Sequence, residues 1–333
     1  MTQIPDTFSA IVVDRPEGRY QAEFRELSLA ELPDQGDVVV RVRYSTINYK
    51  DALAVTGKGR IARKFPIVPG IDLAGEVVES ESDAFKPGDP VLVTGCEIGE
   101  VYWGGYSQYA RMNSQWLVPI PEGLDARLAM GIGTAGFTAM LAVMALEHHG
   151  VDRSGEVVVT GAAGGVGSVA LALLAKAGFQ QILASTGRPE EEAYLKSLGA
   201  TGIIDRSELD QPAKPLESQR WAAAIDVVGG QTLSKLISQM QCGGAVAVCG
   251  LAGGTELHTS VYPIILRGVS VLGINSVYIP HSLRLKAWER VAKDLPLDLL
   301  ESMIRDEPFR KVPELSEQVL AGKVRGRIVV DMG

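Results

Sequence analysis

The pattern of apolar and polar positions divides the chain into two kinds of sequence. In the first part, apolar or alternating runs of strand length, separated by Gly and Pro turn signals, recur at residues 9–15, 37–44, 71–80 and 89–94. Many short strands with few long helices predict a β-rich, barrel-like unit. A long apolar stretch at 126–146 then predicts buried helices, and after it the pattern changes.

Strand-like and helix-like segments alternate in the middle of the chain. The expected strands lie near residues 156–160, 181–186, 203–205, 223–228, 245–249 and 269–275, and the helices between them include 190–198 and 231–240. This alternation predicts an α/β fold with a doubly wound parallel sheet of the Rossmann type. After a helix at about 281–294, a last strand at 327–330 has no place in that sheet. We therefore expect it to return to the first domain.

A glycine-rich loop follows the first strand of this alternating region. The apolar run Glu156–Thr160 leads into Gly161-Ala162-Ala163-Gly164-Gly165-Val166-Gly167, and a helix with an apolar face begins at Ser168. The glycines allow a tight turn and let backbone N–H groups approach a pyrophosphate closely. Between a strand and a helix, this spacing predicts a dinucleotide site. The alternative is an ordinary strand–turn–helix connection.

The tip of the second strand indicates which dinucleotide binds. A site for NAD usually carries Asp or Glu there, but this strand ends in Ser185-Thr186-Gly187-Arg188. Hydroxyls and a guanidinium suit a 2′-phosphate, which a carboxylate would repel. The sequence therefore favours NADPH. Two alternatives stay open: Ser185 or Thr186 caps the next helix, or one of the glutamates at 190–192 turns toward a ribose.

Length, composition and charge limit the remaining possibilities. At 333 residues the chain exceeds one ordinary core, and we expect one domain at 1–124, completed by 277–333, and another at 125–276. With a net charge of −8 and no basic run, partnership with nucleic acid or an anionic membrane is not expected. The start of the chain does not read as a signal peptide. We expect a cytoplasmic protein whose three cysteines are buried thiols: Cys96, Cys242 and Cys249.

A β-rich domain joined to a mid-chain Rossmann domain resembles the medium-chain dehydrogenase/reductase superfamily. Its zinc-dependent members carry a Cys, a Gly-His-Glu and a Cys-rich lobe. This chain has Asn48-Tyr49-Lys50-Asp51 and Gly70-Ile71-Asp72 at the first two places and lacks a Cys cluster. Because zinc needs about four N or S ligands, no metal is expected. The histidines are interpreted as structural or surface residues: His148, His149, His258 and His281.

Further motifs point to one branch of this superfamily. They are Thr46–Gly59, Pro69–Asp72, Trp103–Gly105, Ile132–Met140, Thr160–Ser168, Gly250–Gly254 and Arg325–Arg327. Together they resemble the YhdH/YhfP group of zinc-free quinone-oxidoreductase-like proteins, from about residue 9 to 331. The resemblance implies a GroES-like catalytic domain, a Rossmann domain and NADPH-dependent reduction of acrylyl-CoA.

The group's pattern also implies which positions contact the cofactor. They are Asn48, Thr134, Gly164, Gly165, Val166, Ser185, Arg188, Leu251, Asn275 and Arg327. Asn48 and Thr134 are expected beside the nicotinamide, and Arg327 at a phosphate of the cofactor or of CoA. The alternatives are that Asn48 only holds a turn and that Arg327 is a surface charge on an edge strand.

The implied reaction adds hydride to the β-carbon of an enoyl thioester and a proton to the α-carbon. Tyr49 is the expected proton donor, because a phenol carries its proton at neutral pH. Asp51 is close enough in sequence to orient the phenol or a water, and Lys50 to assist or to bind a CoA phosphate. The alternative is that Tyr49 packs against the nicotinamide and solvent supplies the proton.

Two other functions are compatible with the same fold and cofactor, and the sequence also predicts how the chain assembles. A quinone reductase shares the fold and the hydride donor and differs in the acceptor, whereas a sensor or structural protein would bind NADPH without turnover. The apolar sixth strand at 269–274 is expected at a sheet edge. Exposed edges need cover, so pairing with a second copy predicts a homodimer.

Overall fold

The computed structural model describes residues 4–333, which form two compact units. The first unit comprises the chain up to Thr134 together with residues 277–292 and 300–333, and the second comprises 135–276 and 293–299. The change from one unit to the other therefore falls inside α2 (Ala126–His149), between Thr134 and Ala135. It comes one residue after Gly133, where φ +50° and ψ −163° interrupt the helix.

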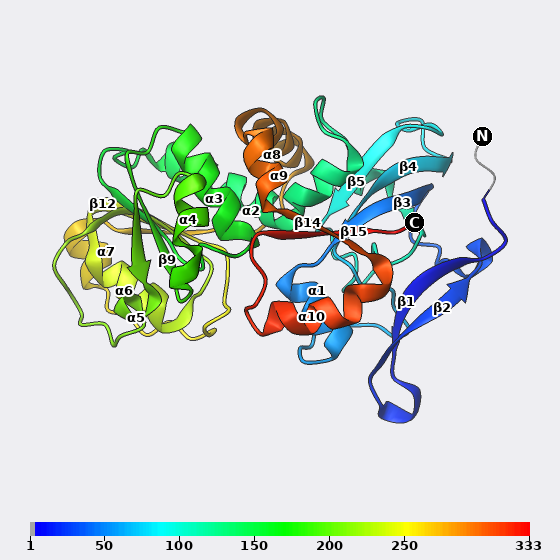
Figure 1. The fold of residues 1–333 in the computed structure, drawn as a ribbon, viewed down its shortest axis with the longest axis horizontal. Coiled ribbons are helices and arrows are strands. Elements are labelled where there is room, and N and C mark those ends of the chain that lie inside the picture. Colours follow the sequence, from blue (N-terminus) through cyan, green and yellow to red (C-terminus); the bar gives the residue numbers. More distant parts are fainter. Residues whose placement is uncertain (1–3) are drawn as a thin grey trace. The chain divides into compact units, whose positions relative to one another are not determined.

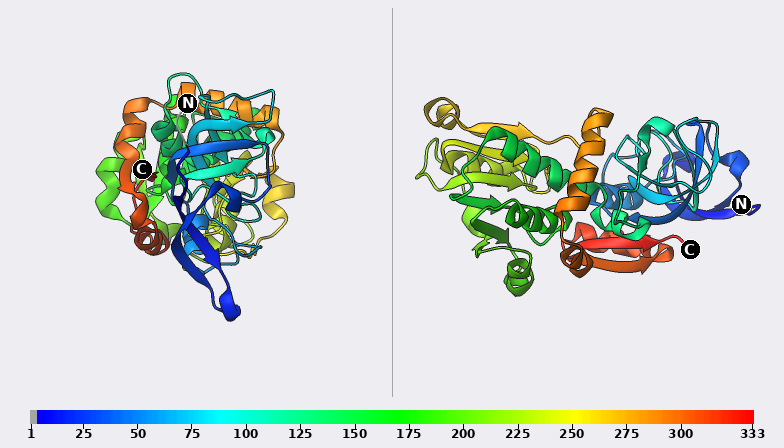
Figure 2. Two further views of the ribbon diagram at one scale, coloured as in Figure 1. Left: turned by 90° about the vertical axis from the view of Figure 1, so that its right-hand side faces the viewer. Right: turned by 90° about the horizontal axis from the view of Figure 1, so that it is seen from above.

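The first unit is built on an antiparallel sheet with one parallel pair, β14–β15. Its strand order is β14-β15-β3-β4-β5-β7, and β6 also pairs with β3. The strands are β3 (Val38–Thr46), β4 (Asp72–Ser80), β5 (Pro90–Thr94), β6 (Tyr109–Met112), β7 (Val118–Pro119), β14 (Ile304–Pro308) and β15 (Arg327–Asp331). A separate hairpin, β1 (Phe8–Asp14) and β2 (Gln21–Leu27), extends from this unit in Figure 2.

The last strand returns to the first unit, which confirms the expectation from sequence. β15 pairs in parallel with β14 and antiparallel with β3, so it is an interior strand. The interpretation of Arg327 as a surface charge on an edge strand is therefore wrong. Strand β14 was not predicted, because its sequence Ile-Arg-Asp-Glu-Pro is strongly polar and tertiary pairing outweighs local propensity.

Helices α1 (Tyr49–Thr56) and α10 (Val312–Leu320) pack on each other in this unit (Figure 1). Helix α8 (His281–Asp294) begins in this unit as well, and α9 (Leu297–Met303) follows it. The apolar core of the unit gathers residues from the hairpin, the sheet and α10, among them Phe8, Val40, Leu73, Tyr106 and Val330.

The second unit is the predicted doubly wound α/β domain. Six parallel strands have the order β10-β9-β8-β11-β12-β13. They are β8 (Glu156–Val159), β9 (Gln181–Thr186), β10 (Gly202–Asp205), β11 (Trp221–Asp226), β12 (Met240–Val248) and β13 (Ser270–Gly273). The order reverses between β8 and β11, and ligands of such sheets bind outside the carboxyl ends of the strands at that point.

Helices connect these strands and pack against the sheet (Figure 1). They are α3 (Gly165–Lys176), α4 (Glu192–Ser197), α5 (Arg206–Leu209), α6 (Gly230–Gln239) and α7 (Tyr262–Arg267). Within residues 4–333, α2 alone has the length and hydropathy of a membrane span, but 78% of its most apolar segment is buried. We interpret it as a core helix.

The cysteines differ from the expectation of three buried thiols. Cys242 is exposed at the start of β12, and Cys96 and Cys249 are half-buried. The prediction failed at Cys242 because it lies with Gly243 on a short exposed part of β12, between the buried Met240 and the buried residues that follow.

Candidate active site

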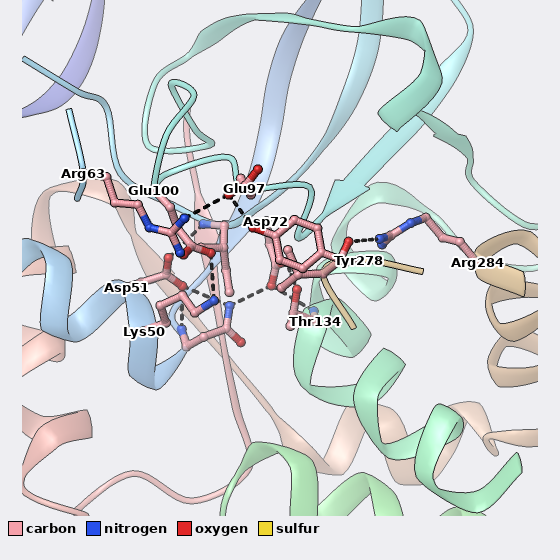
Figure 3. Close-up of polar contacts among 12 residues, drawn as sticks. Lys50, Asp51, Arg63, Asp72, Glu97, Glu100, Thr134, Tyr278 and Arg284 are labelled. Carbon is pink, nitrogen blue, oxygen red and sulfur yellow. Dashed lines mark hydrogen bonds and ion pairs between the residues drawn. The ribbon is translucent and has the colours of Figure 1, made fainter. Parts of the chain in front are cut away.

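A buried carboxylate at the start of β4 lies among polar side chains from three other segments of the first unit. Figure 3 shows two of its neighbours, Asp51 and Thr134. Asp72 is fully buried. Its Oδ2 accepts hydrogen bonds from Asn48 Nδ2 at 2.8 Å and from the backbone N–H of Thr134 at 2.9 Å. The Thr134 hydroxyl donates to Oδ1. We call Asn48, Asp51, Asp72, Thr134 and Arg327 the Asp72 cluster.

Asn48 connects two carboxylates of the cluster. It is the N-cap residue of α1, and Asp51 Oδ2 accepts from both its backbone N–H and its Nδ2, each at 2.9 Å. The N–H of Ile71 donates to Asp51 Oδ1 at 2.8 Å. The amide of Asn48 is therefore fixed, with its Nδ2 shared between Asp51 and Asp72. Asn48 therefore holds the turn at the start of α1, as the alternative interpretation expected. Its contact with the cofactor stays a prediction.

Arg327 brings a positive charge to the cluster. Its guanidinium is buried and donates to Gly131 O at 3.0 Å, to Asn48 Oδ1 at 3.3 Å and to Thr46 Oγ1 at 2.8 Å. The same Asn48 side chain thus donates to two carboxylates and accepts from a guanidinium. These hydrogen bonds hold the Arg327 guanidinium in the interior of the first unit. Its contact with a cofactor phosphate stays a prediction.

The cluster holds two carboxylates against one guanidinium. Burial, and then the charge of Asp72, raise the pKa of Asp51 to about 7, although Asn48 and Ile71 donate to it. Burial also raises the pKa of Asp72, against the hydrogen bonds from Thr134 and Asn48 and the charge of Arg327. The pair therefore titrates as a coupled site with one carboxylate in excess.

Gly133 makes room for this arrangement. A Cβ at this position would lie 2.6 Å from Arg327 Nη2 and 2.9 Å from Asp72 Oδ2. Its φ of +50° also lies in the region that glycine adopts without strain. The interruption of α2 thus turns the N–H of Thr134 toward Asp72, where an unbroken helix would direct it along the helix axis.

Tyr49 and its neighbours lie outside the buried cluster. The Tyr49 side chain is 44% exposed, and its hydroxyl has no hydrogen-bond partner within residues 4–333. Lys50 and Arg63 converge on the nearly buried Glu100, with Lys50 Nζ at 2.7 Å and an Arg63 nitrogen at 3.5 Å (Figure 3). Lys50 is therefore held in an ion pair. Within residues 4–333, Asp51 and the Tyr49 hydroxyl form no hydrogen bond with each other.

The loop that follows β5 carries further polar contacts near this ion pair. Glu97 accepts from Arg63 Nη1 at 3.0 Å and from the Tyr278 hydroxyl. Arg284 is buried and donates to Thr94 O at 2.6 Å. Tyr106 fills the core and donates to Thr46 O at 3.0 Å. Asp72 and this loop were missed as functional candidates because their partners lie far away in sequence.

In the second unit, the glycine loop has a geometry that fits a pyrophosphate. Gly161 has φ +57°, and Gly164 precedes the first turn of α3. The N–H groups of that turn have no carbonyl partner in the helix and face outward. A Cβ on Gly167 would lie 2.5 Å from Gly161 O, so only glycine lets the helix approach the strand this closely. The candidates Gly164, Gly165 and Val166 are half-buried.

The tip of β9 supplies the expected 2′-phosphate candidates. Arg188 lies close to the glycine loop, with Nη2 at 3.4 Å from Ala163 O and Nη1 at 3.7 Å from Glu191. Thr186 Oγ1 accepts from the Arg188 backbone, so it holds a turn and does not cap α4. Ser185 is 2% exposed, and its predicted phosphate contact stays a prediction.

The acidic triplet after this tip is largely committed elsewhere. Glu191 pairs with Arg188, and Glu192 pairs with Lys196 at 2.6 Å on the next turn of α4. Glu191 and Glu192 are therefore held in ion pairs, which disfavours a hydrogen bond from a cofactor ribose to either of them.

Other candidates of the second unit lie after β12 and β13. Leu251 is 58% exposed on the loop after β12, and Asn275 is exposed two residues beyond β13. The buried Asp226, which the sequence analysis passed over, accepts from Thr160 Oγ1 at 2.7 Å and from Gly229 N at 2.8 Å. It connects the ends of β8 and β11 beside the glycine loop.

Within residues 4–333, no group of three or more His, Cys, Asp or Glu side chains is arranged to hold a metal ion. His148 and His149 end α2, and a ring nitrogen of His149 lies 3.1 Å from Gly243 O.

Known proteins resemble this chain along almost its whole length. Residues 34–122 match the alcohol dehydrogenase GroES-like domain, and residues 165–293 match the zinc-binding dehydrogenase family. The acrylyl-CoA reductase AcuI of Ruegeria pomeroyi is 54% identical over 98% of this chain and 99% of its own length. The putative quinone oxidoreductase YhfP of Bacillus subtilis is 43% identical over 98% and 99%.

Solved structures agree with these relatives. The YhdH oxidoreductase of Salmonella enterica in complex with NADP superposes with a TM-score of 0.94 at 48% identity, covering 97% of this chain and 99% of that one. The YhfP structure of Bacillus subtilis, with NAD bound, has a TM-score of 0.93 at 42% identity, covering 98% and 100%. The chain therefore belongs to the YhdH/YhfP group of the medium-chain dehydrogenase/reductase superfamily.

Proposed function

We propose that this protein is an NADPH-dependent oxidoreductase that reduces the activated C=C bond of acrylyl-CoA to give propionyl-CoA, without a metal. The observation that carries the proposal is the 54% identity, over 98% of the chain, to a relative named acrylyl-CoA reductase. A match over 98% of the chain spans both units.

NADPH is the proposed cofactor. The glycine loop fits a pyrophosphate, and the tip of β9 carries Arg188 in place of a carboxylate. The related YhdH of Salmonella enterica was crystallised with NADP. YhfP was crystallised with NAD, so a comparison of both cofactors belongs to the test.

Each proposed cofactor contact keeps the role expected from the resemblance. Asn48 and Thr134 serve the nicotinamide side, and Gly164, Gly165 and Val166 serve the pyrophosphate. The remaining contacts are Ser185, Arg188, Leu251, Asn275 and Arg327.

The mechanism divides the work among residues of the first unit. When bound, NADPH supplies hydride to the β-carbon of the enoyl thioester. The Asp72 cluster holds the Asn48 amide and the Thr134 hydroxyl in one orientation, which prepares them before any ligand arrives. Asp51 acts by fixing Asn48 at the start of α1, where the exposed Tyr49 phenol follows directly.

Tyr49 is the proposed proton donor to the α-carbon. Its exposed hydroxyl has no competing partner in the described chain, so it is available to a ligand. The alternative is that Tyr49 packs against the nicotinamide and water supplies the proton, which an enolate accepts readily.

The nearest rival is a quinone reductase, because YhfP carries that name at 43% identity. A second rival is an NADPH-binding protein without turnover. Steady-state oxidation of NADPH, first with acrylyl-CoA and then with a quinone, separates the three. We expect a higher kcat/KM for acrylyl-CoA. A higher value for the quinone would replace the proposal with the first rival, and tight NADPH binding without oxidation by either acceptor would favour the second.

We also propose a homodimer that forms through the second unit. β13 is one of the two edge strands of its sheet, and the segment that precedes it carries exposed apolar side chains on and near α7: Val261, Tyr262, Ile264, Ile265 and Leu266. An open edge next to an apolar surface suits a second copy of the same chain. Sedimentation at low concentration should give a dimer, and Ile265→Glu should give a monomer. A wild-type monomer would contradict this assembly.

A cytoplasmic location is proposed with it. The long apolar helix α2 is mostly buried in the protein, as expected for a soluble enzyme.

A further inference from the structure

The loop that follows α1 in the first unit is positively charged. Residues 52–71 contain no Asp or Glu, although the whole chain has a net charge of −8. Four basic residues lie within seven positions of this stretch: Lys58, Arg60, Arg63 and Lys64. A local excess of positive charge attracts anions that the rest of the chain repels.

The β1–β2 hairpin brings two more arginines to this loop. Val13 and Ile67 exchange backbone hydrogen bonds of 2.8 and 2.9 Å, so the end of β1 lies beside the residues that follow the loop. The Arg15 guanidinium lies over the Phe65 ring, 4.5 Å from its centroid. Arg19 lies on the same hairpin turn, between β1 and β2. We give the name basic surface to four residues: Arg15, Arg19, Arg60 and Lys64.

Carboxylates do not neutralise the basic surface. Its four residues are exposed, and within residues 4–333 none of their side chains forms an ion pair. Arg15 lies over the Phe65 ring and Lys64 over the Tyr102 ring, 5.7 Å from its centroid. A guanidinium stacked on an aromatic ring keeps its N–H donors available to a phosphate.

The acidic side chains near the basic surface are mostly held by other cations. Asp14 lies 3.7 Å from Arg25, and Glu317 on α10 pairs with Lys58. Glu17, on the hairpin turn, is exposed. The four cations of the basic surface therefore outnumber the acidic groups left to oppose them.

A shared carboxylate connects the basic surface to the start of α1 (Figure 3). Glu100 is 5% exposed, and Lys50 Nζ lies 2.7 Å from its Oε1. An Arg63 side-chain nitrogen lies 3.5 Å from the same carboxylate, and the Arg63 backbone N–H donates to Glu100 O at 2.8 Å. Lys50 directly follows Tyr49, and Arg63 directly precedes Lys64. One ion-pair network therefore joins the proposed proton donor to the basic surface.

We propose that the basic surface binds the phosphate groups of the CoA portion of the substrate while the thioester reaches Tyr49. The inference rests on the proposed function. The 3′-phosphate of CoA is a monoester with a charge of about −1.5 to −2 at neutral pH, and the pyrophosphate adds further negative charge. The paired N–H donors of a guanidinium match such oxygens. Because Glu100 already neutralises Lys50, the phosphate role considered for Lys50 passes to the exposed cations.

Acrylyl-CoA and S-acrylyl-pantetheine test this proposal, because they share the reacting group and only the first carries phosphates. The double variant Arg60→Ala/Lys64→Ala should raise the KM for acrylyl-CoA about tenfold. It should leave kcat/KM for S-acrylyl-pantetheine and the KM for NADPH unchanged, and Arg60→Lys/Lys64→Arg should stay close to wild type. Equal losses with both thioesters, or a loss with neither, would overturn the proposal.

Lys86→Ala is the matched control for these variants. Lys86 is an exposed lysine of the same unit whose side chain forms no ion pair within the described residues. Its removal lowers the overall positive charge by the same kind of group but leaves the basic surface intact, so the KM for acrylyl-CoA should not change. A rise as large as that of the double variant would show a general effect of net charge and would contradict the proposal.

The wild-type protein separates this inference from the proposed function. If it reduces neither thioester, the proposed function itself fails. If it reduces both with equal kcat/KM, the proposed function stands and the recognition of CoA phosphates fails.

Calorimetry with adenosine 3′,5′-bisphosphate gives a second reading that needs no turnover. This compound carries the 3′-phosphate end of CoA, and saturating NADPH keeps it out of the cofactor site. Arg15→Ala should weaken its binding several-fold, and higher ionic strength should weaken binding to the wild type because exposed charges are screened. Equal affinity of Arg15→Ala and wild type, or binding that salt does not change, would contradict a phosphate site on the basic surface.

Discussion

The Asp72 cluster and the glycine loop are two polar sites built in opposite ways. The glycine loop is one contiguous segment, and its useful groups are backbone N–H donors at the start of α3. The Asp72 cluster consists of side chains drawn from distant parts of the chain, and Asn48 and Arg327 are 279 positions apart in sequence. A site of backbone donors depends on the absence of side chains, whereas a buried side-chain cluster depends on every member being present.

The largest expected effect comes from removing the carboxylate at the centre of the cluster. Asp72→Ala removes the buried carboxylate that accepts hydrogen bonds from Asn48 and Thr134 and leaves Asp51 as the one carboxylate of the cluster beside Arg327. Breaking a buried ionic group in this way costs about 3–5 kcal/mol of the free energy of unfolding. Urea denaturation measures it. A loss below about 1 kcal/mol, the value of an exposed ion pair, would show that the cluster does not act as a unit.

Gly133→Ala sharpens the comparison by adding one methyl group to the cluster. We expect a loss of about 2–3 kcal/mol, because left-handed strain adds to the overlap with Arg327 and Asp72. The matched control is Gly123→Ala, where φ is +87° but no atom lies within 4 Å of the added Cβ. That variant should lose only the strain, about 1 kcal/mol. Equal losses in the two variants would contradict the claim that Gly133 makes room for the cluster.

The pH dependence of stability tests the excess carboxylate. Because the pKa of Asp51 is raised to about 7, the folded protein keeps a proton that the unfolded chain releases near pH 4. This contribution to stability is complete below about pH 4 and is lost as pH rises to about 7, with a slope of at most about 1.4 kcal/mol per pH unit.

Asp51→Asn should flatten this slope between pH 5.5 and 7, seen in chemical denaturation at several pH values. Asp83→Asn removes an exposed carboxylate and should leave the slope unchanged. A wild-type stability that rises through the same pH range would contradict the assignment.

The smallest expected effect concerns Tyr49, which lies outside the buried cluster. Tyr49→Phe removes the proposed proton donor but no packing, and water partly replaces it. We expect kcat to fall about tenfold or more while the free energy of unfolding stays within about 0.5 kcal/mol of wild type. Stopped-flow measurement of NADPH oxidation gives kcat. A variant with full kcat at neutral pH would assign the proton to solvent.

The same difference explains what the sequence could reveal. The glycine loop and the six parallel strands were readable because their signals are local: valines, then glycines, then an apolar helix. The role of Asp72 was not, because its partners Asn48 and Thr134 lie 24 and 62 residues away and meet it only in the folded sheet.

Burial changed the interpretation of one charged residue. Arg327 was considered as a surface charge on an edge strand, but its guanidinium lies in the interior of the first unit and donates to Gly131 O. Strand β14 covers one side of β15, and its polar sequence gave no indication of a strand. Such pairings arise from tertiary contacts, which local patterns do not contain.

Transfer of deuterium from NADPH labelled at the nicotinamide C4 position tests the central claim most directly. With acrylyl-CoA as the acceptor, the account predicts propionyl-CoA one mass unit heavier, with the deuterium on the β-carbon, from one face of the labelled nicotinamide. Unlabelled propionyl-CoA from both the 4R- and the 4S-deuterated NADPH, or oxidation of NADPH by a quinone with none by acrylyl-CoA, would contradict it.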